Sequence, residues 1–339
     1  MAYKEGPNPV ADPVKVGRGV KMFAEVEGKG KPMMLVHGFG LTHEMWKYQI
    51  PYLTSRGYHV VAVDLRGFGE SSSMPASYAY DTWAKDLGKA IDKFERDDVT
   101  LVGYSLGGAI AMHYMTTHHD PPVERLALIA AAGPYMTWSK EGVLERMAIY
   151  GLTPVAGVVG TGANVIGRLF NFDIFGAVNE AIIGVSKTVA VLTGQTLAAV
   201  QDILRHWACV GRDPAFFDAL IDLIAMGATP QLIPKIYANG ALLAEPTVVQ
   251  WIEDMLQSSS PEALIGALEE MRNQDLQDSL KNIAVPTTIV GGMLDVLVPP
   301  WLIAEQFIMI QGAEHSMLPG GHGLVLECAD ALNQALAGR

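Results

Sequence analysis

The chain has 339 residues, half of them hydrophobic and only 18% charged, so it can bury a large core and is too apolar to be disordered. A formal net charge of −12 argues against a nucleic-acid surface, which needs clustered Lys and Arg. Cys209 and Cys328 lack the spacing of metal ligands and are interpreted as buried thiols of a reducing compartment, although a single disulfide stays open.

The N-terminal residues and the apolar middle of the chain are the places where a secretory signal and a transmembrane helix would lie. No apolar segment follows a basic start, so we expect no secretory signal and a cytoplasmic protein. The uncharged stretch 150–167 contains Pro154 and five glycines and is too short for a transmembrane helix. We expect no stable membrane insertion, and the sequence leaves open whether the chain forms a homo-oligomer.

Short apolar runs alternate with helical patterns in the first part of the chain. A predicted antiparallel hairpin within 14–30 leads into the first buried strand. The runs that predict strands lie at 33–39, 60–65, 99–105 and 126–132. Strands separated by helices indicate βαβ units, and continuous apolar strands indicate a parallel sheet that is buried on both faces.

The pattern becomes helical between about residues 133 and 281, with apolar positions at i, i+3 and i+4 and several prolines that mark breaks. The sheet resumes at 285–295, followed by a helix from about Pro300, a strand at 313–318 and a C-terminal helix over 324–337. We therefore predict a sheet-containing domain of residues 1–134 and 281–339, with an inserted helical domain of residues 135–280.

The sequence Gly-Tyr-Ser-Leu-Gly at 103–107 follows a predicted strand and opens a predicted helix. This is the context of a nucleophile elbow, in which Ser105 occupies a sharp turn and small neighbours let strand and helix approach each other. The simpler interpretation is a βα turn rich in small residues. A serine hydroxyl needs a histidine to accept its proton and an acid to orient that histidine, so both are expected later in the chain.

Asp295 and His322 are the predicted acid and base. Asp295 follows a buried strand, where a turn-forming or helix-capping aspartate is the alternative. The strand 126–132 is followed by Gly133 and offers no carboxylate. His322 lies in a loop after the predicted last strand, where an exposed, mobile imidazole could reach Ser105, whereas His315 falls within that strand and is interpreted as a partly buried strand histidine.

Two backbone amides are expected to bind the oxyanion of a tetrahedral intermediate. One belongs to Leu106, directly after the nucleophile, and the other to Phe39, between Gly38 and Gly40 in the loop after the first buried strand. A simple glycine turn is the alternative at 38–40. The remaining histidines lack the spacing of a metal site, so we expect neither a metal nor a cofactor.

Five segments together resemble the α/β-hydrolase superfamily, in particular its lipase- and esterase-like members. They occur in the order of that family, at 37–40, 64–71, 103–108, 292–299 and 321–327. The resemblance covers about 15–134 and 282–337. It implies a mostly parallel central sheet with helices on both faces and an inserted helical cap. It also implies that His37 orders its loop and that 64–71 shapes the rim of the active site, so neither is predicted to be catalytic.

The inserted segment 135–280 corresponds to the cap of the family and is long and apolar. Such a cap is a place for an acyl- or ring-binding pocket, although its large apolar residues are more often core than substrate contacts. The candidates for pocket lining are Met136, Trp138, Met147 and Phe170. We expect a small hydrophobic ester, with a medium-length acyl chain or a ring, as the substrate.

The predicted function is hydrolysis of carboxylic esters through an acyl-enzyme on Ser105. C–C bond hydrolases, lactonases and cofactor-free perhydrolases of the same family use a similar triad and stay open. Epoxide hydrolases and haloalkane dehalogenases are disfavoured, because they need a carboxylate where this chain has Ser105. Two further alternatives are a small-ligand receptor built on a hydrolase scaffold and association of an apolar cap with membranes, as in lipases.

Overall fold

The computed structural model describes residues 10–73, 77–94, 98–118, 121–133, 214–225, 227, 246–295, 297–298 and 300–338. The chain divides into two compact units, one of Met1–Met136 with Gly227–Arg339 and one of Thr137–Met226. In the second unit the described helix is α8 (Pro214–Ala225), which buries Phe217, Leu220 and Ile224. The first unit contains the sheet and the predicted site residues.

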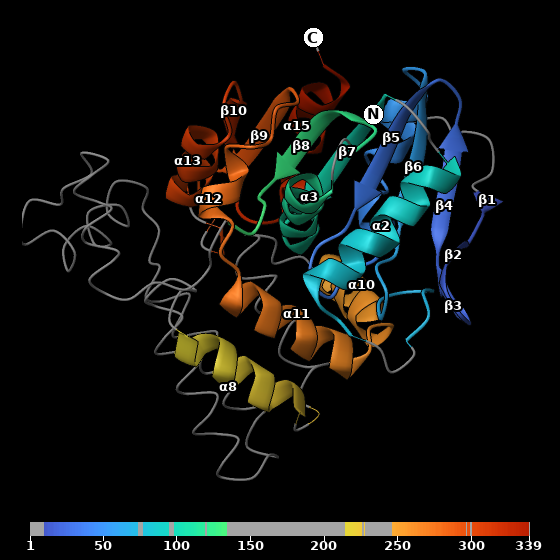
Figure 1. Cartoon of the computed structure of the whole chain (residues 1–339), viewed down its shortest axis with the longest axis vertical. Helices are drawn as coiled ribbons and strands as arrows, with labels where there is room; N and C mark the ends of the chain where they lie inside the picture. Colours follow the sequence, from blue (N-terminus) through green and yellow to red (C-terminus); the bar gives the residue numbers. More distant parts are fainter. Residues whose placement is uncertain are drawn as a thin grey trace, which may run out of the picture. The chain divides into compact units, whose positions relative to one another are not determined.

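An eight-stranded sheet forms the centre of the first unit, in the order β1-β4-β6-β5-β7-β8-β9-β10 (Figure 1). Neighbouring strands from β6 to β10 are parallel, whereas β4 pairs antiparallel with β6 and β1 antiparallel with β4. The strands are β1 (Val10–Ala11), β4 (Ala24–Gly28), β5 (Lys31–Val36), β6 (Tyr58–Val63), β7 (Val99–Tyr104), β8 (Val123–Ile129), β9 (Thr287–Gly292) and β10 (Glu314–Leu318).

The parallel strands confirm the prediction from the apolar runs. All six residues of β7 are buried, as are the last four of β5 and of β6, because helices cover both faces of a parallel sheet. The predicted N-terminal hairpin is divided differently. Its first half forms a separate two-stranded sheet of β2 (Val14–Gly17) and β3 (Val20–Met22), while β4 joins the main sheet beside β6.

Two groups of helices flank the sheet. On one side α2 and α3 contact each other, and α3 lies against β7 (Figure 1). The helix α2 is amphipathic and buries Trp83 and Leu87, whereas α3 is apolar around most of its circumference. A second group is formed by α1 and α15, which contact β6 and β9 and each other. These helices are α1 (Ile50–Thr54), α2 (Tyr80–Phe94), α3 (Leu106–Thr117) and α15 (Ala329–Ala337).

The helices after residue 246 also belong to the first unit. They are α10 (Pro246–Gln257), α11 (Pro261–Asn273), α12 (Gln277–Leu280), α13 (Pro300–Met309) and α14 (Leu324–Glu327), with the short helix η1 (His43–Trp46) earlier in the chain. Leu256 of α10 contacts Gly40, and Ala263 of α11 lies against Gly67. The predicted helical domain of 135–280 stays a prediction, because most of that segment lies outside the described residues.

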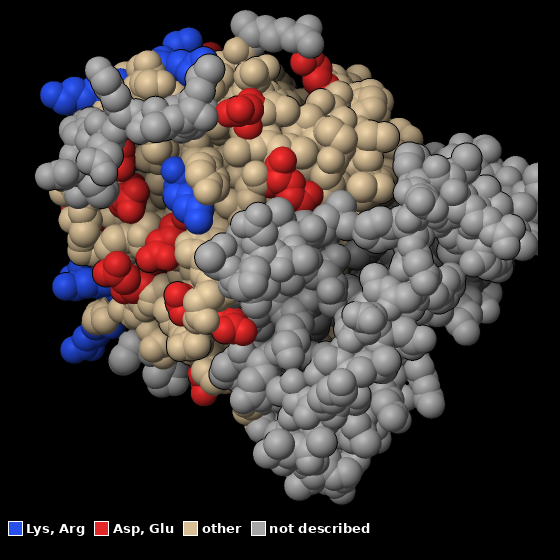
Figure 2. Space-filling view, turned by 180° about the vertical axis from the view of Figure 1, so that it is seen from behind, with Lys and Arg blue, Asp and Glu red and all other residues tan. Residues whose placement is uncertain are grey.

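The surface of the described residues mixes charges. In the face that Figure 2 shows, Lys and Arg side chains are interspersed with Asp and Glu side chains. Among the described helices, none has both the length and the apolar content needed to cross a membrane. The described cysteine, Cys328, is a half-buried free thiol, and Cys209 lies outside the described residues.

Candidate active site

Ser105 occupies the turn between β7 and α3, with backbone angles φ 51° and ψ −116°. A positive φ is unfavourable for a residue with a Cβ atom, so the surrounding structure must hold this turn. Its amide donates to the carbonyl oxygen of Ile129 across 3.0 Å, and its carbonyl oxygen accepts from the Ala132 amide across 2.9 Å. The end of β8 therefore fixes the serine in the strained geometry that the Gly-x-Ser-x-Gly pattern predicts.

The two glycines of the pattern are required by close packing. A Cβ atom added to Gly103 would lie 2.5 Å from the carbonyl oxygen of Gly107. One added to Gly107 would collide with the carbonyl oxygens of Val36 and His37, at the end of β5. Neither contact can be relieved by rotating a side chain, because both involve backbone atoms. The glycines thus allow strand, helix and the 37–40 loop to meet around Ser105.

His322 lies between Ser105 and Asp295. Its Nε2 atom is 3.1 Å from Oγ of Ser105, and its Nδ1 atom is 2.8 Å from Oδ2 of Asp295. An ionised carboxylate accepts hydrogen bonds, so it favours the tautomer with the proton on Nδ1 and leaves Nε2 as the acceptor for the serine hydroxyl. Three side chains that are distant in the sequence are thus joined in one hydrogen-bonded path.

The loop after β9 holds the carboxylate of Asp295. Its Oδ1 atom accepts from the amides of Leu297 and Val298 across 2.9 and 2.8 Å, which leaves Oδ2 to face His322. Asp295 is only 3% exposed, so few water molecules compete for its carboxylate. Asp295 therefore caps its turn, which was the alternative considered from the sequence, and also contacts His322.

The two C-terminal histidines differ from their expected burial. His322 was predicted to be exposed in its loop but is 1% exposed, because the phenol ring of Tyr104 packs against its imidazole with centroids 5.2 Å apart. His315 lies in β10 as predicted but is exposed, with its ring against Phe307. The structure therefore brings His322, and not His315, to Ser105.

The predicted oxyanion loop lies directly against the nucleophile. A Cβ atom on Gly38 would be 3.2 Å from Cβ of Ser105 and 2.8 Å from the ring of Tyr104, so the loop and the elbow are in contact. Phe39, the next residue, is buried. Leu106 is the first residue of α3, where the amide has no acceptor within the helix, and the N-terminus of a helix attracts negative charge.

His37 orders this loop in its neutral form. Its Nδ1 atom lies 2.7 Å from the carbonyl oxygen of Gly38, and its Nε2 atom accepts from the Leu65 amide across 2.9 Å. A neutral imidazole with the proton on Nδ1 satisfies both contacts. Burial lowers the pKa of His37 to about 4, against partial compensation by Asp64 and the Gly38 carbonyl. The side chain is therefore neutral at physiological pH, which fits the structural role that the resemblance implied.

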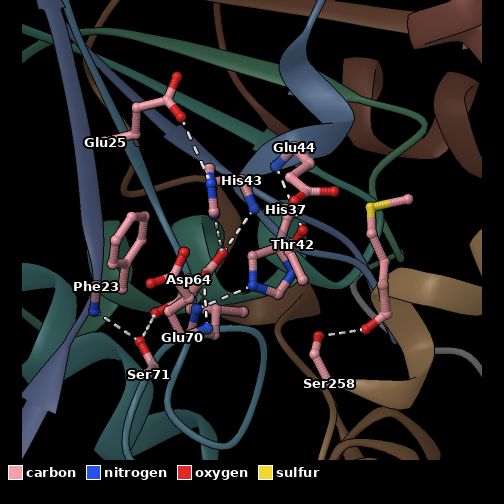
Figure 3. Close-up of polar contacts among 12 residues, drawn as sticks. Phe23, Glu25, His37, Thr42, His43, Glu44, Asp64, Glu70, Ser71 and Ser258 are labelled. Carbon is pink, nitrogen blue, oxygen red and sulfur yellow. Dashed lines mark hydrogen bonds and ion pairs between the residues drawn. The ribbon is translucent and has the colours of Figure 1, made fainter. Parts of the chain in front are cut away.

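A second network of polar contacts is centred on Asp64 (Figure 3). Oδ1 of Asp64 accepts from the backbone amide and from Nδ1 of His43, across 2.6 and 2.9 Å, and Oδ2 accepts from the Glu70 amide. On its other side His43 faces Glu25, with 3.5 Å between Nε2 and Oε2. The network ties β4, η1 and the loop after β6 together.

The charges in this network compensate one another. Burial by itself would lower the pKa of His43, but the hydrogen bond and charge of Asp64 outweigh it and raise this pKa. Burial would likewise raise the pKa of Asp64, and the contacts with His43 lower it instead. For Glu25, burial raises the pKa and His43 offsets only part of the effect. The raised pKa of His43 and the lowered pKa of Asp64 thus have one shared cause, the contact between them, which favours the charged form of each side chain.

Some predicted features lie outside the described residues. These are the four candidates for pocket lining, Met136, Trp138, Met147 and Phe170. Within the described part of the chain, no three His, Cys, Asp or Glu side chains are grouped closely enough to hold a metal ion.

Comparison with known proteins identifies the family. A family model described as alpha/beta hydrolase fold matches residues 31–156. The AB hydrolase superfamily protein YisY of Bacillus subtilis is 40% identical over 327 residues, which are 96% of this chain and 97% of that protein. The chain belongs to the α/β-hydrolase superfamily. The hydrolase is also 25% identical, over 95% of its length and 97% of the relative, to a non-heme haloperoxidase of Rhodococcus erythropolis.

A solved structure shares the fold of the hydrolase. An esterase from Exiguobacterium antarcticum aligns with a TM-score of 0.73 and 22% identity, covering 96% of this chain and 98% of the esterase. At this identity the likeness shows the fold. The predicted fold class, an α/β-hydrolase fold around a mostly parallel sheet, is confirmed, and the protein is a hydrolase of this superfamily.

The sequence did not single out two residues that contact the loop of His322. The phenol of Tyr104 donates to the backbone carbonyl oxygen of His322 across 2.6 Å. The carboxylate of Glu327 accepts from the amide of Gly321. Both residues lie in motifs that the sequence revealed, Tyr104 before the nucleophile and Glu327 five residues after the histidine, but their side chains had no assigned role.

Proposed function

We propose that the hydrolase cleaves carboxylic esters through an acyl-enzyme on Ser105. The observation that carries this proposal is the hydrogen-bonded path from Oγ of Ser105 through His322 to Asp295, in which each heavy-atom distance is 3.1 Å or less. Nucleophile, base and orienting acid within hydrogen-bond reach are the arrangement that activates a serine hydroxyl. The strained turn that presents Ser105 supports the same assignment.

In the proposed reaction, Oγ of Ser105 attacks the ester carbonyl while Nε2 of His322 takes its proton. Asp295 stabilises the imidazolium, and the amides of Phe39 and Leu106 bind the oxyanion. Collapse of the tetrahedral intermediate expels the alcohol, which takes its proton from His322. Water, deprotonated by His322, then attacks the acyl-enzyme and releases the carboxylic acid and the free serine.

The proposed substrate is a small hydrophobic ester with a medium-length acyl chain or a ring. The support is the apolar composition of 135–280, which we propose to be the cap over the site. A preference for acetyl and short polar esters, measured as a higher kcat/KM than for longer chains, would contradict this part. We further propose a cytoplasmic location, which the free thiol of Cys328 supports.

The test is labelling of the intact protein by a fluorophosphonate probe together with turnover of p-nitrophenyl esters of increasing chain length. Ser105→Ala is expected to stay folded and to lose both labelling and nearly all turnover. Ser55→Ala, which removes an exposed serine hydroxyl at the end of α1, serves as the matched control and should retain both. Substantial turnover by Ser105→Ala would reveal another nucleophile, and a folded wild type that binds ligand without labelling would favour a receptor.

A second candidate function is perhydrolysis, favoured by the full-length similarity to the non-heme haloperoxidase of Rhodococcus erythropolis. Hydrogen peroxide would replace water as the attacking species, so that the acyl-enzyme is converted to a peracid and the serine hydroxyl is regenerated. Peracid formed from acetate and hydrogen peroxide oxidises bromide, which gives a colorimetric assay. Screening lactones and β-diketones beside esters in the same experiment separates the lactonase and C–C hydrolase alternatives.

A further inference from the structure

Glu327 is a charged residue next to the site to which the proposed mechanism assigns no step. It is the last residue of α14 and is half-buried. Its Oε2 atom accepts from the amide of Gly321, the residue immediately before His322. A Cβ atom on Gly320 would lie 2.7 Å from the same Oε2 atom, so the carboxylate occupies the space that this glycine leaves open.

The loop that carries the imidazole is therefore held on both sides. Glu327 binds the amide of Gly321 before the histidine, and Tyr104 binds the carbonyl oxygen of His322 itself. The loop is also joined to the strand that leads to the acid, because the Leu294 amide donates to the Gly320 carbonyl oxygen across 2.9 Å. Of the two side chains that hold it, Glu327 is the one that titrates near neutral pH.

The groups around Glu327 shift the pKa of its carboxyl. Its pKa is raised to about 6, chiefly by burial and further by the negative charge of Asp295. The amide of Gly321, the charge of His322 and the amide of Gly323 act in the opposite direction and lower this pKa. Cys328 is the neighbouring titratable side chain, and its own pKa is raised, first by burial and then by Glu327. Oε1 of Glu327 has no hydrogen-bond partner in the described part of the chain, so a proton can be accommodated there.

We propose that Glu327 is a positioning residue for His322, whose ionised carboxylate anchors the histidine loop and favours the imidazolium that forms during acyl transfer. This inference rests on the proposed function of Ser105 and His322. Protonation of Glu327 removes its negative charge and weakens its hydrogen bond to the loop, because hydrogen bonds to ionised acceptors are stronger than those to neutral ones. The base is then less well aligned and its charged form less stabilised.

The test is the pH dependence of kcat and KM for a p-nitrophenyl ester, in the full chain, for wild type and Glu327→Gln. Glutamine keeps the shape and an oxygen acceptor but has no charge. We expect kcat to fall about 10- to 100-fold at pH 7.5 with KM nearly unchanged, since small misalignments of catalytic groups cost this much. On the acid side, wild type should lose a further 10- to 100-fold in kcat as Glu327 is protonated around pH 6, a step that the variant lacks.

Two further variants test the positioning role of Glu327 without relying on Glu327→Gln alone. Gly320→Ala places a methyl group where the Glu327 carboxylate lies and should reproduce the loss in kcat. Cys328→Ala alters the adjacent residue without touching the carboxylate and should retain the rate and acid limb of wild type. If Glu327→Gln does not fold, as judged by its melting transition, Gly320→Ala decides the question.

The outcomes separate this inference from the proposed function. Wild-type protein that neither labels with a fluorophosphonate nor hydrolyses esters would overturn the proposed function. An active wild type whose Glu327→Gln variant has the same kcat and the same acid limb would overturn only the positioning role. A change confined to KM, or an equal loss in Cys328→Ala, would also overturn it, because either result indicates a general disturbance of packing.

Discussion

The phenol of Tyr104 donates a hydrogen bond to the backbone carbonyl oxygen of His322 across 2.6 Å. Tyr104 is the last residue of β7 and precedes Ser105, so the strand that presents the proposed nucleophile also holds the backbone of the proposed base. Tyr104 is 1% exposed, and its ring also contacts Trp46 and Gly38. One residue therefore connects the elbow, the predicted oxyanion loop and the loop of His322.

Tyr104→Phe removes this hydrogen bond and leaves the His322 carbonyl oxygen without that donor. We expect a loss of about 0.5–1.5 kcal/mol in the free energy of unfolding, because one hydrogen bond to a buried acceptor is removed, and a several-fold lower kcat. Tyr58→Phe is the matched control, since the Tyr58 phenol also donates to a backbone carbonyl oxygen, that of Ala337, across 2.7 Å. Urea unfolding and ester turnover of both variants provide the measurement. Equal losses of kcat in the two variants would contradict the connection between Tyr104 and the base.

Asp295→Asn tests the orientation of His322. Two backbone amides bind Oδ1, so the asparagine oxygen is expected to stay there and the NH₂ group to face Nδ1 of the imidazole. An NH₂ group donates, so it favours the tautomer with the proton on Nε2, which cannot accept from Ser105. We expect kcat to fall about 10³- to 10⁴-fold with the melting temperature within a few degrees of wild type. A loss smaller than about tenfold would argue against Asp295 as the orienting acid.

The strands and the elbow could be predicted because their signals are local. An apolar run between turns indicates a buried strand, and a serine between glycines at the strand end indicates the elbow, so β5 to β10 and the turn at Ser105 were found without the structure. Asp295 could be chosen because the other strand end at residues 130–133 offers no carboxylate. Each of these inferences depends on residues that are neighbours in the sequence.

The contacts that hold the site join residues that are far apart in the chain. Tyr104 and His322 are separated by 218 positions, and neither residue has a local pattern that indicates the other. The burial of His322 was missed for the same reason, because a loop is expected to be exposed until the side chain that covers it is known. The proposed role of Glu327 needed the fold of its own loop, in which the chain turns back toward Gly321.

His37→Gln tests the neutral histidine of the oxyanion loop. In the folded protein the pKa of His37 is about 4, against 6.5 for the unfolded chain, so the unfolded state takes up a proton first as the pH falls. The contribution to stability is therefore fully present above pH 6.5 and is lost between about pH 6.5 and 4, with a total of about 3 kcal/mol.

The measurement is the free energy of unfolding from pH 7.5 to 4 for both proteins. Glutamine can accept from the Leu65 amide but does not titrate, so the variant should be less stable at pH 7.5 and should lose less stability on acidification. The difference between the two curves isolates His37 from the carboxylates, which titrate in both proteins. Parallel curves would show that His37 takes up its proton equally in the folded and unfolded states.

Arg66 and Asp86 form a buried ion pair between the 64–71 segment and α2. The guanidinium donates through Nε to Oδ2 and through Nη2 to Oδ1, across 2.7 and 2.8 Å, and both side chains are less than 10% exposed. Removing either partner leaves an uncompensated buried charge, which costs about 3–5 kcal/mol, whereas replacing both with apolar residues can be nearly neutral. We therefore expect Arg66→Met and Asp86→Leu each to be strongly destabilising and the double variant to be markedly more stable than the sum of the two losses predicts.

The urea midpoint of tryptophan fluorescence measures these losses, and Trp83 is a suitable reporter because its indole Nε1 donates to the Arg66 carbonyl oxygen. The exposed pair of Lys93 and Asp12 is the matched control, and Asp12→Ala should cost less than about 1 kcal/mol. Strictly additive losses in the Arg66 and Asp86 variants would mean that the two charges do not compensate each other. A strong coupling would instead show that charge pairing fixes the segment after β6 to α2.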